Sequence, residues 1–342
     1  MSPKLTIEMR ILYICAERLS GNLTGGKIEN IGDILELSKH SRVDVITPYD
    51  IENLPDIFSK NPNIHVYKHH NITKNPFNFF FKNSSNIYKT KIDYSIYDTI
   101  ILSCFRTFYH LYNYKINRRK KLIIKSHGSI LKWNISNFKM QRNISLRYVI
   151  KKISKIIIYS VVETIVPIYV NEIWYMTSQE DNLIAKILKK PKKINKLGSS
   201  VYFEEISRTI TKDISMNNSN SCFIIGDWNI PHNTSALIEF FKSPHINKFK
   251  KIIIVGNMNN ITKQCLNINK IKNVIMLGYL KDIRQFQAGS YTWVVCADGG
   301  SGVPIKLIEA CEFADKIICT SYCYSLMQLE NLNKKNIPVE VF

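Results

Sequence analysis

The feature that most constrains this chain is a series of short apolar runs, each separated from the next by a stretch with helical periodicity. The first run is RILYICA at residues 10–16, and a helical pattern with Ile28, Ile31 and Leu35 on one face follows it. Similar runs recur at residues 43–48, 64–69, 98–104, 121–127 and 172–178. Single strands that alternate with helices predict a parallel sheet with helices on both faces. We therefore expect the N-terminal part to be a doubly wound α/β domain.

The same pattern begins again after a polar stretch at residues 206–220, which is weakly periodic and typical of a linker. Further apolar runs follow at residues 222–228, 251–257, 273–279 and 291–298, with helical patterns between them. A chain of 342 residues has room for about two domains. We expect an N-terminal domain at residues 1–205 and a second α/β domain at residues 221–342.

The chain is strongly basic, with 47 Lys and Arg residues against 27 Asp and Glu residues, a net charge of +20. This balance favours anionic partners such as nucleotides, phospholipid surfaces or nucleic acid. The sequence is also rich in Asn, Ile, Lys and Tyr, as an AT-rich genome would encode. The lysine content alone therefore does not require a ligand.

The sequence does not support a secreted, a membrane-spanning, a disulfide-rich or a metal-binding protein. The N-terminus lacks a signal-peptide pattern, and the apolar run at residues 156–170 is too short for a membrane span and contains Glu163 and Pro167, so we expect buried elements there. The 8 cysteines lie mostly in apolar runs without paired spacing, which favours buried free thiols in a reducing compartment. His69 and His70 are adjacent in a predicted strand and point to opposite faces, so no metal site is expected.

The most informative segment is GGSGVPIKLIEACEFADKIICTS, residues 299–321. Its glycines allow a tight turn close to a ligand, and Pro304 suits the first turn of a helix whose free amides can bind an anion. Lys306 and Glu309 lie three residues apart, beside the expected buried stripe. A lysine there can contact phosphate oxygens, and the carboxylate can accept hydrogen bonds from ribose hydroxyls. The alternative is an exposed ion pair worth only roughly 0.2–0.5 kcal/mol.

The second half of the chain resembles the nucleotide-binding domain of GT-B-fold glycosyltransferases, specifically the retaining group 1 (family 4) enzymes. The resemblance is carried by four segments in order: FIIGDWNIPHNTSALIEFF (223–241), IIIVGN (252–257), NVIMLGYLKDIRQFQAGS (273–290) and the segment at 299–321. From the first to the last, the four segments span roughly 100 residues, which is about the length of a typical domain. The first half is similar only in layout and in TGGK (24–27) and KSHGS (125–129). The resemblance implies a GT-B architecture, in which two Rossmann-like doubly wound parallel-sheet domains face each other across a cleft.

The resemblance also implies roles for particular residues. Lys306 would contact the donor diphosphate, Glu309 the ribose, and His127 the donor sugar, although a loop histidine with a structural hydrogen bond is an alternative for His127. The residues implied for donor and phosphate binding are Gly25, Gly26, Gly226, Asp227, Gly300, Ser301, Gly302, Val303, Lys306 and Glu309. Gly25 and Gly26 would form a loop that closes over donor and acceptor.

The chain departs from the family pattern at three places. Ser301 stands where many members have a glutamate that contacts the sugar. Asp227, Trp228 and Asn229 follow Gly226 where members have a basic pair, so the phosphate charge would depend mainly on Lys306 and the helix end. The helix that usually crosses back to the first domain would be absent or shortened.

The segment FKMQRNISLRYVIKKISKIIIY, residues 138–159, interleaves basic and apolar side chains. Its basic residues are Arg142, Arg147, Lys151, Lys152 and Lys155. A helix of this kind can lie on an anionic membrane surface, and the alternative is a surface helix that packs one face on the core. PFNFFFKN at residues 76–83 suits either a lipid or acceptor contact or a position in the core.

The resemblance implies a glycosyltransferase that moves a sugar from a UDP- or GDP-linked donor to a glycan, lipid-linked or protein acceptor, with retention. No D-x-D motif occurs in a suitable loop, so we expect no metal cofactor. The basic surface suits a lipid-phosphate-linked acceptor in surface polysaccharide or lipopolysaccharide synthesis, in the cytoplasm or peripherally on the inner face of the plasma membrane. No nucleic-acid partner is expected, and the oligomeric state stays open.

Three alternatives remain open at this point. A nucleotide-sugar epimerase of the same fold would recruit Asp227 or Asp298 as an acid or base. A non-catalytic basic module would bind nucleotides or nucleic acid in a salt-sensitive way. A glycosyltransferase-like scaffold without activity would be consistent with the missing basic pair.

Overall fold

The computed structural model describes most of the chain as two compact units. The described residues are 9–15, 19, 24–48, 54–69, 93–108, 120–126, 135, 146–177, 183–194, 198–210, 217–265, 273–280, 283–300 and 302–342. Unit 1 comprises Met1–Leu131 and Leu146–Tyr202, and unit 2 comprises Lys132–Ser145 and Phe203–Phe342. The helix α8 (Gly198–Ser207) carries the chain from one unit to the next.

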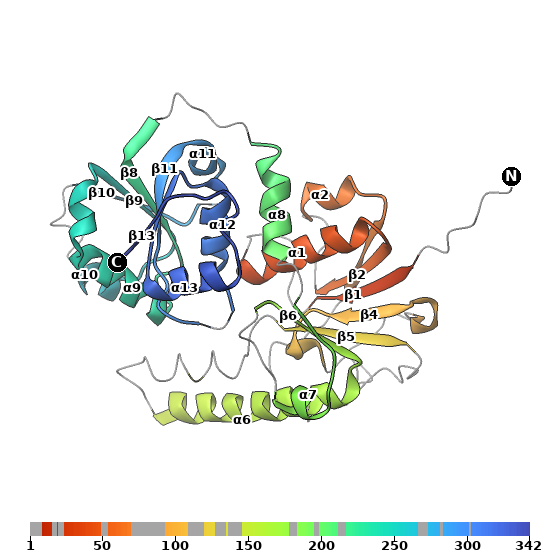
Figure 1. The fold of residues 1–342 in the computed structure, drawn as a ribbon. Coiled ribbons are helices and arrows are strands. Elements are labelled where there is room, and N and C mark those ends of the chain that lie inside the picture. Colours follow the sequence, from red (N-terminus) through yellow and green to blue (C-terminus); the bar gives the residue numbers. More distant parts are fainter. Residues whose placement is uncertain are drawn as a thin grey trace, which may run out of the picture. The chain divides into compact units, whose positions relative to one another are not determined.

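In the described part of unit 1, seven parallel strands form one sheet in the order β3-β2-β1-β4-β5-β6-β7 (Figure 1). The strands are β1 (Arg10–Ile14), β2 (Arg42–Pro48), β3 (Ile64–His69), β4 (Thr99–Leu102), β5 (Lys121–Ser126), β6 (Glu172–Tyr175) and β7 (Lys192–Ile194). The helices are α1 (Gly25–Ser38), α2 (Asp56–Ser59), α6 (Leu146–Tyr169), α7 (Leu183–Ile187) and the start of α8, with single 3-10 turns at Tyr94–Ile96 and Phe105–Phe108. Each apolar run predicted as a strand in this half forms one.

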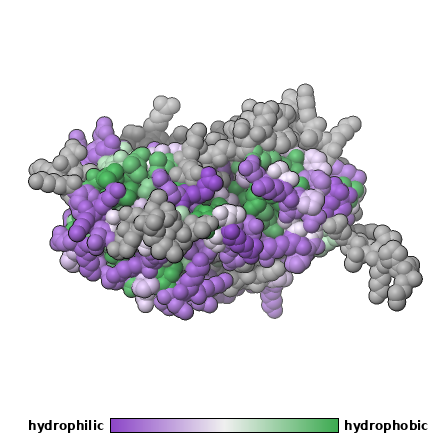
Figure 2. All heavy atoms as spheres, turned by 90° about the horizontal axis from the view of Figure 1, so that it is seen from above, coloured by the Kyte–Doolittle hydropathy of each residue, from purple (hydrophilic) through white to green (hydrophobic). Residues whose placement is uncertain are grey.

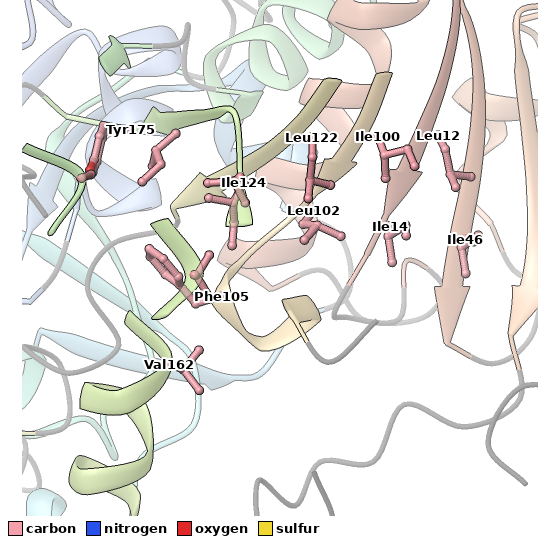
Figure 3. Close-up of a cluster of buried hydrophobic side chains, with 14 of the residues drawn as sticks. Leu12, Ile14, Ile46, Ile100, Leu102, Phe105, Leu122, Ile124, Val162 and Tyr175 are labelled. Atoms are coloured by element: carbon pink, nitrogen blue, oxygen red, sulfur yellow. The ribbon is translucent and has the colours of Figure 1, made fainter. Parts of the chain in front are cut away.

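The core of unit 1 lies between this sheet and α6 (Figure 3). The sheet contributes Leu12, Ile14, Ile100, Leu102, Leu122 and Ile124, all buried. From the other side, Val162 and Val166 of α6 are buried in the same cluster, and Val162 points from the helix toward Phe105 and the sheet. Full burial of one such aliphatic side chain contributes about 1.5–3 kcal/mol. This valine face therefore fixes α6 on the sheet.

A buried group of charged side chains joins β5 to α1. The Lys125 ammonium donates to Glu29 Oε1 at 2.6 Å and also to Asp33 Oδ1, and all three side chains are almost fully buried. Tyr13 of β1 donates its hydroxyl to Asp33 Oδ2 at 2.8 Å. Burial is the main cause that raises the pKa of Asp33 to about 7, with Lys125 opposing it. Two carboxylates thus share one ammonium inside the protein.

The same glutamate holds the start of α8. Glu29 accepts hydrogen bonds from the backbone N–H groups of Gly198 and Ser199, both at 2.8 Å. Next to these bonds the backbones of α1 and α8 touch, because a Cβ on Gly32 would lie only 1.6 Å from the carbonyl oxygen of Gly198. Only glycine fits at that crossing.

In the described part of unit 2, six parallel strands form a second sheet in the order β10-β9-β8-β11-β12-β13. The strands are β8 (Asn217–Ile225), β9 (Lys251–Val255), β10 (Val274–Gly278), β11 (Ser290–Val295), β12 (Lys316–Cys319) and β13 (Val339–Val341). The helices are α9 (Pro231–Lys242), α10 (Asn260–Cys265), α11 (Arg284–Ala288), α12 (Ile305–Phe313) and α13 (Ser321–Leu329), with a 3-10 turn at Pro244–Lys248.

The two sheets share one strand order. Numbered within its own unit, each sheet contains the order 3-2-1-4-5-6, which is that of a doubly wound Rossmann-like fold. The order reverses between β1 and β4 in unit 1 and between β8 and β11 in unit 2. In such folds ligands bind beyond the carboxyl ends of the strands at the point of reversal. The predicted fold class is therefore confirmed, and the topology indicates where a ligand site is expected.

Three local expectations need correction. The strand β8 begins at Asn217, inside the stretch expected to be a linker. The elements α13 and β13 were not expected at all, because the sequence after residue 321 has no clear periodic pattern. The apolar run at 156–170 was expected to be buried, but in α6 it is buried on one side only, and Ile157 and Ile168 are more than half exposed.

Hydrophilic side chains cover most of the described surface drawn in Figure 2, with apolar side chains gathered in smaller areas. None of the helices in the described ranges has both the length and the apolar content needed to cross a bilayer. Every cysteine whose side chain is described is a free thiol, and Cys15, Cys222, Cys296, Cys311, Cys319 and Cys323 are buried, as expected.

Candidate functional site

The candidate site lies at the carboxyl ends of β8 and β11, where the strand order of unit 2 reverses. The backbone is tightly packed at the ends of β8 and β9. Gly256 has φ +121°, and a Cβ there would lie 1.7 Å from the carbonyl oxygen of Gly226. Beside these glycines the indole of Trp228 is fully buried and donates to the carbonyl of Val255 at 3.1 Å. The turn after β8 is therefore rigid, and it leads directly into α9.

Lys306, in the first turn of α12, reaches back to this reversal point. Its ammonium donates to the side-chain oxygen of Asn233 at 2.8 Å and to the backbone carbonyl of Cys296, just after β11. It also lies 5.5 Å from the centre of a Trp228 ring, which is a cation–π distance. The side chain thus connects the helix that follows β11 with the helix that follows β8.

The environment of Lys306 is poorly solvated. Burial lowers its pKa from the usual value near 10.5 to about 8. Among the residues that the structure describes, no carboxylate forms an ion pair with this ammonium. A cation held in this way favours an anionic ligand, because such a ligand would supply the counter-charge that the protein does not.

Glu309 lies one turn further along α12 and is 6% exposed. Its Oε1 accepts a hydrogen bond of 2.6 Å from the side-chain amide of Gln287 in α11. Burial raises the pKa of this carboxyl from 4.5 to about 7, opposed by the hydrogen bond from Gln287. Lys306 and Glu309 have different partners and neither is fully exposed, so the alternative of a surface ion pair is excluded.

The loop before α12 has the backbone geometry predicted from its glycines. Gly300 and Gly302 have φ values of +135° and +80°, which side-chain-bearing residues rarely adopt. Val303 is buried, and Pro304 is the N-cap of α12 rather than a residue of its first turn. Its carbonyl accepts from the amides of Leu307 and Ile308. Ser301 lies outside the described residues.

His232, at the start of α9, faces the same loop. Its Nε2 would lie 3.9 Å from a Cβ placed on Gly300. Burial and the nearby Lys306 charge lower the pKa of His232 to about 4, so the imidazole is neutral near pH 7. A neutral imidazole there can donate or accept a hydrogen bond without repelling Lys306.

Sequence reasoning missed three residues of this constellation, namely His232, Asn233 and Gln287. The signal for the first two was the tripeptide PHN directly after the turn of β8, at a carboxyl strand end. Gln287 had no signal, since nothing in the sequence pairs it with a glutamate 22 residues away.

The other predicted site residues do not join this constellation through any described side-chain contact. Gly25 and Gly26 begin α1 and are not a loop, because the helix starts one turn earlier than its apolar pattern indicated. Asp227 is exposed, and its carboxylate accepts from the backbone N–H of Asn229 at 3.1 Å, which is a turn-forming role. Gly226 belongs to the tight turn described above. His127 and Arg142 lie outside the described residues, as does the segment 76–83.

Two doubly wound units with this strand order define the GT-B fold, and the site in the second unit lies where that fold accommodates a ligand. The comparisons with known proteins agree on the fold. No family model and no curated protein matches the sequence.

Solved structures match over almost the whole chain, at low identity. Sucrose-phosphate synthase from Thermosynechococcus elongatus has a TM-score of 0.57 and 11% identity, covering 92% of this chain and 82% of its own. HepE from Anabaena, solved with UDP and glucose, has a TM-score of 0.54 and 12% identity, covering 92% and 81%. A putative UDP-N-acetylglucosamine 2-epimerase from Listeria monocytogenes has a TM-score of 0.50 and 11% identity, covering 96% and 86%. At these identities the likeness establishes the GT-B fold.

Proposed function

We propose that this protein is a glycosyltransferase that uses a nucleotide-diphosphate sugar. The observation that carries the proposal is the position of Lys306: a poorly solvated ammonium without a carboxylate partner in the described chain, at the reversal point of the unit 2 sheet. The fold likeness to sucrose-phosphate synthase and to HepE with bound UDP supports the same class.

The donor would bind along α12. The Lys306 ammonium and the backbone N–H groups of Ile305 and Lys306, which have no partner within the helix, would face the diphosphate. The Glu309 carboxylate, held by Gln287, would accept hydrogen bonds from the two ribose hydroxyls. Asn233 would hold Lys306 in place, and His232 would offer one neutral hydrogen bond near the phosphates.

In the reaction the bond between the anomeric carbon and the diphosphate oxygen breaks, and a bond forms between that carbon and the acceptor hydroxyl oxygen. The electron pair of the broken bond stays on the diphosphate, whose growing negative charge Lys306 and the α12 amides stabilise. A leaving phosphate oxygen takes the acceptor proton. We propose retention at the anomeric carbon, because a leaving phosphate oxygen that takes the acceptor proton lies on the same face of the sugar as the attacking hydroxyl, and the anomeric configuration of the product by NMR tests it.

We further propose that the acceptor is a glycan or a lipid-linked glycan of surface polysaccharide or lipopolysaccharide synthesis, reached from the cytoplasmic side of the plasma membrane. The net charge of +20 supports an anionic, phosphate-linked acceptor. We also propose that transfer needs no metal ion, because Lys306 and the helix amides supply positive charge at the diphosphate. Turnover that survives EDTA would support this, and loss restored by Mg²⁺ would contradict it.

A panel of UDP- and GDP-linked sugars tests the donor site, with thermal shift and nucleotide release as readouts. We expect stabilisation by one donor and its free nucleotide, lost in Lys306→Ala and Glu309→Ala. The matched controls are Lys248→Ala and Glu239→Ala, exposed residues of the same unit that should leave binding unchanged. Failure of every nucleotide diphosphate to bind would overturn the proposal.

A nucleotide-sugar epimerase is the second candidate, because the Listeria monocytogenes protein shares the fold. It would convert a UDP-sugar without any acceptor. Asp227 and Asp298, the carboxylates considered for its chemistry, are both exposed, and the Asp227 carboxylate is engaged by the backbone N–H of Asn229. Epimer formed from donor alone, with no transfer to any acceptor, would decide for this candidate.

A further inference from the structure

The outward face of α6 carries exposed aliphatic side chains from Ile150 to Ile168, interrupted by the exposed Thr164, although the opposite face already packs on the sheet. Five aliphatic side chains are exposed on it: Ile150 (61%), Ile153 (45%), Ile157 (58%), Val161 (39%) and Ile168 (55%). At 3.6 residues per turn these positions fall within an arc of about 80°, so they form one stripe. We call these five residues the α6 stripe. It runs about 27 Å from Ile150 to Ile168.

The α6 stripe is distinct from the face of α6 that packs in the core of unit 1. The core-facing residues Val162 and Val166 are buried among the sheet side chains, and Figure 3 shows Val162 on the side of α6 that faces the sheet. By helical spacing the stripe falls on the other side of the helix. An isolated exposed isoleucine is ordinary, but five exposed aliphatic side chains on one face of a helix are typical of an interaction surface.

The charge of α6 indicates which partner fits. The helix carries Arg147, Lys151, Lys152 and Lys155, and Glu163 is its one acidic residue. The whole chain has a net charge of +20. An aliphatic stripe on a basic helix of a basic chain is complementary to an anionic bilayer, where the apolar side chains enter the acyl boundary and the charge of the protein meets the headgroups.

We infer that the α6 stripe is the surface by which this protein docks on an anionic lipid bilayer, with α6 lying in the plane of the interface. A second copy of the chain is the competing occupant. A symmetric contact through α6 would bring two basic helices and two chains of charge +20 together, which is unfavourable. The bilayer removes this repulsion because its own charge is negative.

This inference concerns a partner and does not depend on the proposed transfer reaction. The test is co-sedimentation of the full chain with phosphatidylcholine vesicles that contain or lack phosphatidylglycerol, at low and high salt. We expect binding that requires phosphatidylglycerol and weakens with salt. The variant Ile150→Asn/Ile157→Asn should lower the partition constant by about tenfold or more.

The matched control is Ile275→Asn/Leu329→Asn, which changes two exposed aliphatic residues of unit 2, 40% and 56% exposed. It should bind vesicles as the unchanged protein does. All four substituted residues are 40% exposed or more, so both variants should keep the melting temperature and the nucleotide binding of the unchanged protein. Unchanged values would show that both variants are folded. Equal vesicle binding by the two variants would overturn the inference. So would a dimer in analytical ultracentrifugation that only the stripe variant dissociates, without a change in vesicle binding.

Discussion

The side-chain oxygen of Asn233 accepts a 2.8 Å hydrogen bond from the Lys306 ammonium, across 73 residues of sequence. Because asparagine is neutral, it positions the lysine without neutralising it. Asn233→Ala should weaken binding of the nucleoside diphosphate that the donor panel identifies about tenfold by releasing the lysine. Asn233→Asp is nearly isosteric but pairs Lys306 with a carboxylate that repels phosphate, so binding should fall at least about tenfold further. Calorimetry with that nucleoside diphosphate measures both, and an aspartate variant that binds as well as the unchanged protein would contradict this role.

The two principal site residues predict a narrow pH range for donor binding. Lys306 is protonated below its pKa of about 8, and Glu309 is ionised above its pKa of about 7. A diphosphate needs the protonated lysine, and ribose hydroxyls are accepted best by the ionised carboxylate. The affinity for the donor's nucleoside diphosphate should therefore peak between pH 7 and pH 8 and fall on both sides. In Glu309→Gln the acidic limb should disappear while the alkaline limb stays.

Glu309 should lower the stability of the empty protein at neutral and alkaline pH. Its folded pKa of about 7 is above the usual value of 4.5, so the folded state holds the proton more tightly. The stabilisation from that proton is present below pH 4.5 and lost as the pH rises through 7. Glu309→Gln should therefore raise the free energy of unfolding by about 1–3 kcal/mol at pH 8 and by little at pH 5. Melting curves of both proteins at the two pH values measure the difference, and a gain that is equal at both would argue against a buried charge.

In unit 1 the buried ammonium of Lys125 compensates Glu29 and Asp33. Lys125→Met should cost about 3–5 kcal/mol, because it leaves two carboxylates buried without a counter-charge. Adding Asp33→Asn should restore part of the loss. Urea unfolding followed by limited proteolysis measures this, and Lys121→Met is the control, since Lys121 forms an exposed pair with Glu172 that is worth at most about 1 kcal/mol. Equal destabilisation by the two lysine changes would contradict the role of the cluster.

The sequence was informative where a local pattern determines the outcome. Alternating apolar runs predicted the parallel sheets, and the glycines at 299–302 predicted a loop that leads into the helix with Lys306 and Glu309. It was uninformative where a contact joins distant residues. Lys125 stands inside the apolar run KLIIKS, and only the fold brings it to Glu29, 96 residues away. Gln287 becomes a site residue for the same reason, since only the fold brings it to Glu309.

Short elements at the end of unit 2 were missed because their stability comes from tertiary contacts. The strand β13 has only three residues and is stabilised by parallel pairing with β12 at the edge of the sheet. The helix α13 begins at Ser321 after the N-cap Thr320, whose hydroxyl accepts a hydrogen bond from the amide of Cys323. This cap could be recognised only once the position of the preceding strand was known.

The strand order shared by the two units has a consequence for how such proteins diverge. The order in which the strands are connected depends on the whole chain, so no single substitution can change it. In contrast, one substitution is enough to remove a motif residue, such as the glutamate of the family pattern at the position of Ser301. Sucrose-phosphate synthase shares the fold of this chain at 11% identity, so the path of the backbone is kept although most side chains differ. A lineage with this strand order can therefore exchange side chains at the carboxyl ends of β8 and β11 over time, while the place where those side chains meet stays fixed by the path of the backbone.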